Sequence, residues 1–237
     1  MILGLDTATQ ATVVAVLPDA GEPVELRHDP ASGERPGHAR ELLPLAQQAL
    51  NAVGATFADV ARIGVGVGPG TFTGLRIGVA TARALAQGTG AEVAAISTLD
   101  ALAEAASAAE RPVLAVLDAR RGEAFAAAYL GGERVAGPVA IAPEELAAFA
   151  ERAAAAALRA RAAPGASARP NSWLAVGDGA IRFRDRLVPA ADVPGDDSTL
   201  HRVSALAVCR LARAAPTVDR DALLPEYVRP PDAVPRR

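Results

Sequence analysis

The chain has 237 residues, of which 24 are basic and 27 are acidic, so its formal net charge is −3. All the basic residues are arginines, and the absence of lysine excludes a Walker A phosphate loop, a Schiff-base lysine and a lysine general base. The single cysteine, Cys209, excludes an internal disulfide and a multi-cysteine metal site. The near-neutral charge and the aromatic content of 3% argue against a chain that binds nucleic acid on its own.

The first half of the chain predicts alternating strands and helices. Strands are expected at residues 2–5, 12–17, 60–67 and 93–96, and helices over 74–87 and 99–109. A further helix is expected where apolar residues recur from Leu42 to Val53, with Pro44 in its first turn or at a kink. Thr73 is expected to cap the helix over 74–87, and Gly88 and Gly90 to end it.

The second half repeats the opening pattern. Apolar segments at 113–117 and 124–130 flank a polar turn at 118–123, as the segments at 2–5 and 12–17 flank the turn that begins at Asp6. This repeat predicts a duplicated α/β domain with a boundary near 105–112. Helices over 143–158 and 203–214, a strand at 173–176 and a variable loop at 159–170 complete the expected elements.

Two segments could carry chemistry. The Asp6 turn could present backbone N–H groups to a phosphate and a carboxylate to a metal, or it could be an ordinary hairpin with an Asx turn. The segment 64–78 is a glycine-rich loop that opens a helix, which can bind an anion, but it lacks the lysine of a phosphate loop. Its small residues Gly74, Gly78, Ala82 and Ala86 form one helical stripe, which suits a partner helix or internal packing equally well.

The histidines and the cysteine give no catalytic pattern. His28, His38 and His201 are the only histidines, and no pair of them has the H-x-x-x-H spacing of a metal site. Cys209 lies on an apolar helical face and is expected to be a small buried residue. No basic leader or long apolar stretch is present, so a cytoplasmic protein without a membrane segment is expected.

Five blocks, taken in order along the chain, resemble the TsaB family. They are residues 2–7 with Thr9, the loop and helix start at 68–78, and the segments 97–99, 118–123 and 225–229. The resemblance implies two related actin-like (ASKHA, RNase H-like) α/β domains with mixed sheets flanked by helices. These would be residues 1–108 and 109–237, with the last helix and tail packing back on the first domain.

The resemblance also implies a role in forming N6-threonylcarbamoyladenosine in tRNA, beside a catalytic TsaD-like paralogue and a TsaE-like ATPase. The helices that would meet the paralogue match 38–53 and 74–87. The expected interface residues are His38, Leu42, Leu45, Ala46, Ala49, Leu75, Gly78, Val79, Ala82, Leu85 and Ala86. The expected degenerate nucleotide cleft contains Asp6, Thr7, Ala8, Asp118, Gly177, Asp178 and Gly179.

Two departures from the catalytic paralogue point to a scaffold. The paralogue carries H-x-x-x-H after its Gly-Pro-Gly block, whereas residues 97–102 here contain no histidine. Ala8 stands where many actin-like ATPases have glycine, and its side chain hinders close approach of a phosphate. We therefore expect no catalytic residue, no metal and no directly bound cofactor, with ATP used by the partners.

Other functions and contacts are left open by the sequence. An autonomous actin-like ATPase would use Asp6 and Asp118, and a metallopeptidase is disfavoured by the histidine pattern. Homodimerisation through the same helices is open. Contact with tRNA is expected mainly through the assembled complex, and a direct contact of Arg159, Arg161 and Arg169 with its phosphates is an open and less favoured alternative.

Overall fold

The computed structural model describes residues 1–31, 33–160, 173–188 and 190–229. The chain forms two compact units. The first unit contains Met1–Ala101 and Val203–Glu226, and the second contains Leu102–Arg202 and the chain from Tyr227 onward. The chain therefore leaves the first unit, builds the second and returns. The loop expected at 159–170 lies outside the described residues from position 161 onward.

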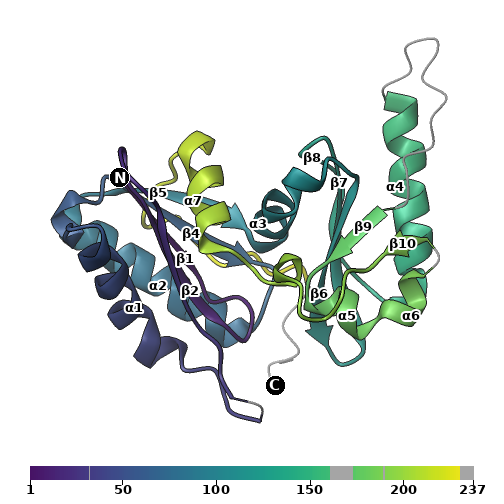
Figure 1. The fold of residues 1–237 in the computed structure, drawn as a ribbon, viewed down its shortest axis with the longest axis horizontal. Coiled ribbons are helices and arrows are strands. Elements are labelled where there is room, and N and C mark those ends of the chain that lie inside the picture. The colour runs from purple at the N-terminus through teal and green to yellow at the C-terminus, as the bar shows by residue number, and fades with distance from the viewer. Residues whose placement is uncertain (32, 161–172, 189, 230–237) are drawn as a thin grey trace, which may run out of the picture. The chain divides into compact units, whose positions relative to one another are not determined.

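The first unit is built on a five-stranded mixed sheet with the order β3-β2-β1-β4-β5 (Figure 1). β1 pairs antiparallel with β2, and β2 with β3, whereas β1–β4 and β4–β5 are parallel. The strands are β1 (Ile2–Asp6), β2 (Thr12–Leu17), β3 (Val24–His28), β4 (Arg62–Gly68) and β5 (Glu92–Ser97).

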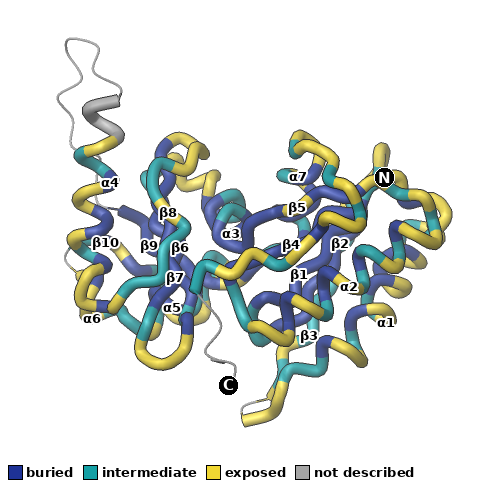
Figure 2. The backbone as a smooth tube through the Cα atoms, turned by 180° about the vertical axis from the view of Figure 1, so that it is seen from behind, coloured by how far each residue is buried: buried dark blue, intermediate teal, exposed yellow. Residues whose placement is uncertain are grey.

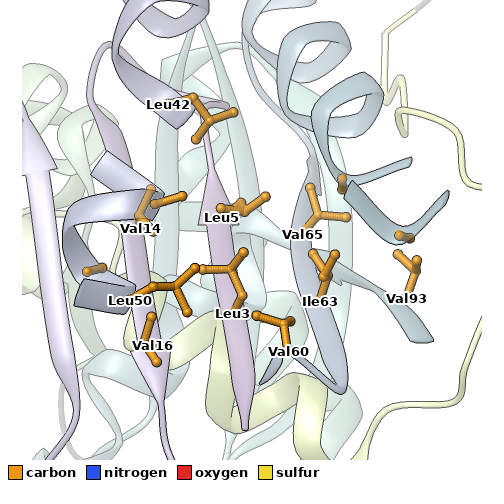
Figure 3. Close-up of a cluster of buried hydrophobic side chains, with 14 of the residues drawn as sticks. Leu3, Leu5, Val14, Val16, Leu42, Leu50, Val60, Ile63, Val65 and Val93 are labelled. Carbon is orange, nitrogen blue, oxygen red and sulfur yellow. The ribbon is translucent and has the colours of Figure 1, made fainter. Parts of the chain in front are cut away.

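Two helices, α1 (His38–Ala52) and α2 (Phe72–Thr89), cover one face of this sheet (Figure 1). Successive side chains of a strand point to opposite faces, so Leu3 and Leu5 of β1 share the face toward these helices. Figure 3 shows both leucines in one cluster with Leu42 and Leu50 of α1. This cluster is the core of the first unit.

The opposite face of the sheet is covered by α7 (Ala205–Ala214). The approach is so close that a Cβ atom at Gly4 would lie 2.4 Å from the Ala205 carbonyl oxygen. Side chains from the sheet bind both ends of the helix. Glu25 accepts the Leu206 backbone N–H at 3.1 Å, and Arg62 donates to the Ala212 carbonyl oxygen at 2.7 Å. Both ends of α7 are therefore capped by strand residues.

The second unit has a five-stranded sheet with the order β10-β9-β6-β7-β8. β6–β7 and β7–β8 are antiparallel, and β6–β9 and β9–β10 are parallel. The strands are β6 (Val113–Arg120), β7 (Glu123–Leu130), β8 (Glu133–Ile141), β9 (Trp173–Val176) and β10 (Ala191–Asp192). Its helices are α4 (Leu146–Ala160), α5 (Asp178–Arg182) and α6 (Arg184–Leu187), while α3 (Thr98–Ala105) crosses the division between the units.

The two sheets repeat one another in strand order and direction. Each is a three-stranded antiparallel meander followed by two parallel strands on the side of its first strand. The prediction of two related α/β units, each with a mixed sheet, is therefore confirmed. The strands β1, β2, β4, β6, β7 and β9 are largely buried, whereas the residues of the edge strands β3 and β8 are intermediate or exposed (Figure 2). Among the described residues, no helix combines the length and the apolar character needed to span a bilayer.

Several local expectations differ from the structure. α2 begins at Phe72 with Thr71, not Thr73, at its N-cap, while Gly90 ends it in the left-handed conformation as expected. Gly88 lies within the helix. Pro44 lies in the second turn of α1, after its first turn. Short 3-10 helices occupy Phe57–Asp59, Ser107–Ala109, Pro143–Glu145 and Thr199–His201.

Candidate functional site

Asp6 is enclosed at the end of β1. None of its surface is exposed. One carboxylate oxygen accepts the Ala8 backbone N–H at 2.8 Å, which is an Asx turn, and the other accepts the Thr98 hydroxyl at 3.1 Å. Burial raises the pKa of Asp6 to about 6, against the lowering effect of these two hydrogen bonds. Asp6 therefore ties the turn to the start of α3.

The glycine-rich loop closes over this turn. Thr71 donates its backbone N–H to the Ala8 carbonyl oxygen at 2.7 Å, and Ala8 is only 1% exposed. A Cβ atom at Gly70 would lie 2.4 Å from the same oxygen, so only glycine fits at this position. The space beside Ala8, where a phosphate would have to lie, is thus filled by the protein's own loop.

The small-residue stripe of α2 faces the sheet. A Cβ atom at Gly74 would lie 1.9 Å from the Thr7 carbonyl oxygen, and one at Gly78 would lie 2.5 Å from the Thr7 hydroxyl oxygen. The Thr7 hydroxyl donates to the Gly74 carbonyl oxygen at 2.7 Å. Ala82 and Ala86 belong to the core cluster of the first unit. The stripe therefore serves internal packing, one of the two alternatives that the sequence left open.

This placement corrects the expected interface. Leu45 and Leu85 are partly buried and pack against the core cluster. The other expected interface residues are buried within the first unit: His38, Leu42, Ala46, Ala49, Leu75, Gly78, Val79, Ala82 and Ala86. The physical reason is that helical spacing shows which residues share a face, but not whether that face packs on the protein's own sheet.

The outward face of α2 carries a different set of residues, which sequence reasoning missed. Arg76, Ala80 and Ala84 recur every four residues and are offset by two positions from the buried stripe. They line a groove of about 440 Å³ between α2 and the tail segment that contains Leu224. Arg83 spans the groove to Asp221 at 3.4 Å. The four-residue spacing that marks the buried stripe of α2 also marks this outward face, but the outward face could be identified only after the stripe was known to be internal.

In the second unit, Asp118 and the segment 177–179 lie together at the end of β6. Asp178 accepts the Asp118 backbone N–H at 3.0 Å, and burial raises the pKa of Asp178. A Cβ atom at Gly177 would lie 2.1 Å from the Val116 carbonyl oxygen, and one at Gly179 would lie 2.6 Å from the Leu117 carbonyl carbon. The expected cleft residues thus form two clusters, this one and that of Asp6, Thr7 and Ala8, each within its own unit.

The histidines and Cys209 contribute to packing. His38 is buried with its Nδ1 atom 2.8 Å from the Thr12 hydroxyl oxygen, and His201 lies 3.1 Å from the Gly177 carbonyl oxygen. Cys209 is buried against the sheet, as predicted, and burial raises its pKa to about 12. Within the described ranges, no three His, Cys, Asp or Glu side chains are grouped so that they could hold a metal.

Comparison with known proteins places the chain in a family. The family model "TsaD: tRNA N6-adenosine threonylcarbamoyltransferase" matches residues 34–205. The protein named tRNA threonylcarbamoyladenosine biosynthesis protein TsaB from Escherichia coli strain K12 is 37% identical over 131 residues, which are 54% of each chain. The protein of the same name from Haemophilus influenzae is 36% identical over 126 residues, 52% of this chain and 51% of the other. The matches thus span about half the length of these relatives.

A solved structure matches nearly the whole chain. YeaZ from Pseudomonas aeruginosa is 27% identical, with a TM-score of 0.72 over 95% of this chain and 98% of the other. The family match, the curated relatives and this fold agree with the resemblance found in the sequence. The chain belongs to the TsaB/YeaZ family within the TsaD-related group of proteins.

Proposed function

We propose that this chain is a non-catalytic subunit in the formation of N6-threonylcarbamoyladenosine in tRNA. It would pair with a TsaD-like paralogue, which carries the transfer chemistry, while a TsaE-like ATPase uses ATP. Family membership supports the role in this tRNA modification. The closed turn at Asp6 is the observation that supports a structural part in it.

The argument from the turn concerns space and hydrogen bonds. Both Asp6 carboxylate oxygens accept hydrogen bonds from within the first unit, and neither has exposed surface. A phosphate could reach Asp6 or Ala8 only if the loop that contains Gly70 and Thr71 left its place. That movement would break the 2.7 Å hydrogen bond from Thr71 to Ala8. The turn is therefore suited to joining β1, α2 and α3, and poorly suited to holding a nucleotide.

The surface proposed for pairing is the outward face of α1 and α2. It exposes two large apolar side chains, Leu43 on α1 and Phe72 on α2. Ala80 and Ala84 lie on the same outward face of α2 and would allow a second helix to approach closely. Apolar and small residues of this kind on one helical face suit packing against helices of a partner. The pairing would therefore use the expected helices, but through the face opposite to the predicted stripe.

Reconstitution tests the proposal. The chain is mixed with the TsaD-like and TsaE-like proteins, co-elution is followed by gel filtration, and tRNA modification is measured with and without it. We expect a stable complex, and modification that requires this chain. Ala80→Glu should abolish co-elution, whereas Ala148→Glu, which changes another exposed alanine, on α4, should not. Equal loss in both variants would contradict the assigned surface.

The catalytic alternative is tested by Asp6→Asn. We expect this variant to support tRNA modification as well as the wild type does, because Asp6 touches only groups of its own unit. ATP turnover by the isolated chain that disappears in Asp6→Asn would contradict the proposal and favour an autonomous ATPase. The Ala80→Glu variant also tests whether the isolated chain homodimerises through this face, since it would shift such a dimer to monomer.

A further inference from the structure

A groove runs along the outward face of α2, and all the residues that line it belong to the first unit. On α2 they extend from Arg76 to Gln87, a length of about 16 Å along the helix axis, which matches about three turns of a second helix. Ala80 and Ala84 lie within this stretch, and their short side chains allow a second helix to approach closely. The groove therefore suits a helix better than a small ligand that must be enclosed.

The tail segment forms the opposite wall of the groove and is anchored at both ends. The backbone N–H groups of Val218 and Glu226 donate to carbonyl oxygens of β5 and β4, at 2.9 Å and 2.7 Å. Between them, Leu223 is buried in the core cluster of the first unit, whereas its neighbour Leu224 is 65% exposed and lines the groove. An anchored segment thus keeps an apolar side chain exposed to water, and its burial under a partner would be favourable.

Two arginines of the groove share one carboxylate. Oδ1 of Asp221 lies 3.4 Å from Nη2 of Arg83 and 3.5 Å from Nε of Arg220. Among the described residues that line the groove, Asp221 is the one acidic residue. Asp219 precedes it by two positions, lies outside the lining set and accepts the Asp221 backbone N–H at 2.7 Å. Because arginine stays protonated, Asp221 can balance only one of the two cations that it contacts.

These two ion pairs are open to solvent. The side chains of Arg83, Arg220 and Asp221 are 37%, 41% and 73% exposed. Ion pairs with this exposure contribute little to stability, so exchanging one partner for another costs little. A carboxylate from a docked chain would meet the same guanidinium groups where the docked chain excludes water, and there the attraction is stronger.

The groove is continuous with the surface proposed for pairing. At one end of the groove, the Arg76 guanidinium lies 3.9 Å from the centroid of the Phe72 ring. Phe72 belongs to the exposed face of α1 and α2 that is proposed to meet the TsaD-like protein. A chain that packs on that face therefore also meets the groove.

The charge of the groove disfavours a second copy of this chain. In a two-fold contact centred on the groove, each copy would present the same surface to the other. Arg83 and Arg220 of one copy would then face those of its partner, and like charges across an interface oppose association. A different chain that brings carboxylates would instead be attracted.

We propose that the groove receives a helix of the TsaD-like partner that is apolar on one face and acidic at its flank. Its apolar face would pack on the alanines of α2 and on Leu224. Its carboxylates would take the place of Asp221 on Arg83 and Arg220. This inference rests on the proposed function and adds to it the chemistry of the partner: Asp221 holds the arginines in the unpaired chain and yields them on pairing.

The test measures the affinity of this chain for the TsaD-like protein by titration calorimetry at several salt concentrations. The double variant Arg83→Gln/Arg220→Gln should bind roughly threefold to tenfold more weakly at low salt, and its binding should depend less on salt. Asp221→Asn should bind roughly twofold to fivefold more tightly, because the arginines lose their internal partner. The control Arg210→Gln, an exposed arginine of α7 in the same unit, should match the wild type.

The apolar part of the contact is tested separately. Leu224→Ala should weaken binding roughly tenfold, because the burial of an exposed leucine is lost. The control is Val188→Ala, which changes a 55% exposed apolar residue of the second unit and should have no effect. Melting temperatures should stay close to that of the wild type in both variants, since both side chains are exposed. Equal binding by Leu224→Ala and the wild type would overturn the proposed packing.

The direction of the Asp221→Asn effect is decisive. Weaker binding in this variant, as in the arginine variant, would mean that Asp221 only holds the tail in place, and it would overturn the proposal. Unchanged binding in both variants would overturn it as well. So would a loss of self-association, or of tRNA binding by the complex, while pairing with the TsaD-like protein stays intact. A wild-type chain that does not pair refutes the proposed function, whereas normal pairing that ignores these changes refutes only the groove.

Discussion

Replacing Asp6 with asparagine should stabilise the protein at neutral and alkaline pH. Burial raises the pKa of Asp6 to about 6, above its ordinary value of 3.8. Below pH 3.8 the carboxyl is protonated in both the folded and unfolded states. As the pH rises toward 6, the unfolded state ionises first, so stability falls across this range. Above pH 6 both states are ionised, and the full cost of the buried charge remains.

The size of the effect follows from the pKa difference. About two pKa units correspond to about 3 kcal/mol, because each unit is worth about 1.4 kcal/mol. Asparagine carries no charge and has the same shape. Its amide oxygen can accept the Ala8 N–H, and its amide nitrogen can donate to the Thr98 hydroxyl oxygen, so both hydrogen bonds of the turn are kept.

The assay is urea unfolding of wild type and Asp6→Asn, followed by far-UV circular dichroism from pH 4 to pH 8. We expect similar free energies of unfolding near pH 4 and an advantage for the variant of up to about 3 kcal/mol at pH 8. The pKa of His38 is lowered by burial, and its own pH dependence cancels because the two proteins are compared at each pH. A variant that is less stable at pH 8, or a pH-independent difference, would refute the reasoning.

Three other predictions concern the packing of the first unit. Gly78→Leu should destabilise the chain by about 1–3 kcal/mol, because a side chain there meets Thr7. Ala80→Leu, on the exposed face of α2, should leave the melting temperature nearly unchanged. A larger loss of melting temperature in Ala80→Leu than in Gly78→Leu would show that the small-residue stripe is external. Arg62→Ala should lower the free energy of unfolding by about 1–2 kcal/mol and increase amide hydrogen exchange at the C-terminal end of α7. The control variant Arg210→Ala should do neither. Equal amide exchange in the two variants would rule out the capping role of Arg62. Cys209 should resist thiol reagents in the folded protein at pH 8 and react in urea, as mass spectrometry would show; rapid labelling of the native chain would contradict its burial.

The apolar strands could be predicted from the sequence, including the edge strand β5, whereas the polar edge strands β3 and β8 could not. Segments such as 12–17 and 124–130 are apolar because both of their faces are covered, so composition alone marks them. β3 and β8 lie at sheet edges and carry polar residues such as Glu25 and Glu133, which left them without a strand signal. The repeat of the hairpin was sufficient to predict the duplication, because each hairpin starts its sheet in the same way.

The candidate site was predictable in its residues and not in its contacts. Asp6 and the glycine-rich loop were identified from residue types in turns. The glycine-rich loop closes over the Asp6 turn through a contact between Thr71 and Ala8, which are more than 60 positions apart in the chain. Local sequence patterns do not encode a contact of this range. In the turn between β6 and β7, the positive φ of Arg120 and Arg121 was equally hidden, because arginine gives no signal for that conformation.

The placement of α7 has a consequence for biosynthesis. This helix completes the first unit, yet it is encoded after nearly all of the second. While the ribosome synthesises the residues between, Gly4 and Gly64 line a sheet face whose covering helix does not yet exist. The sheet of the second unit is complete in the chain before α7 is synthesised. We expect chaperones to cover this apolar face of the nascent chain until α7, which contains Cys209, emerges from the ribosome. A chain released before that point is expected to aggregate.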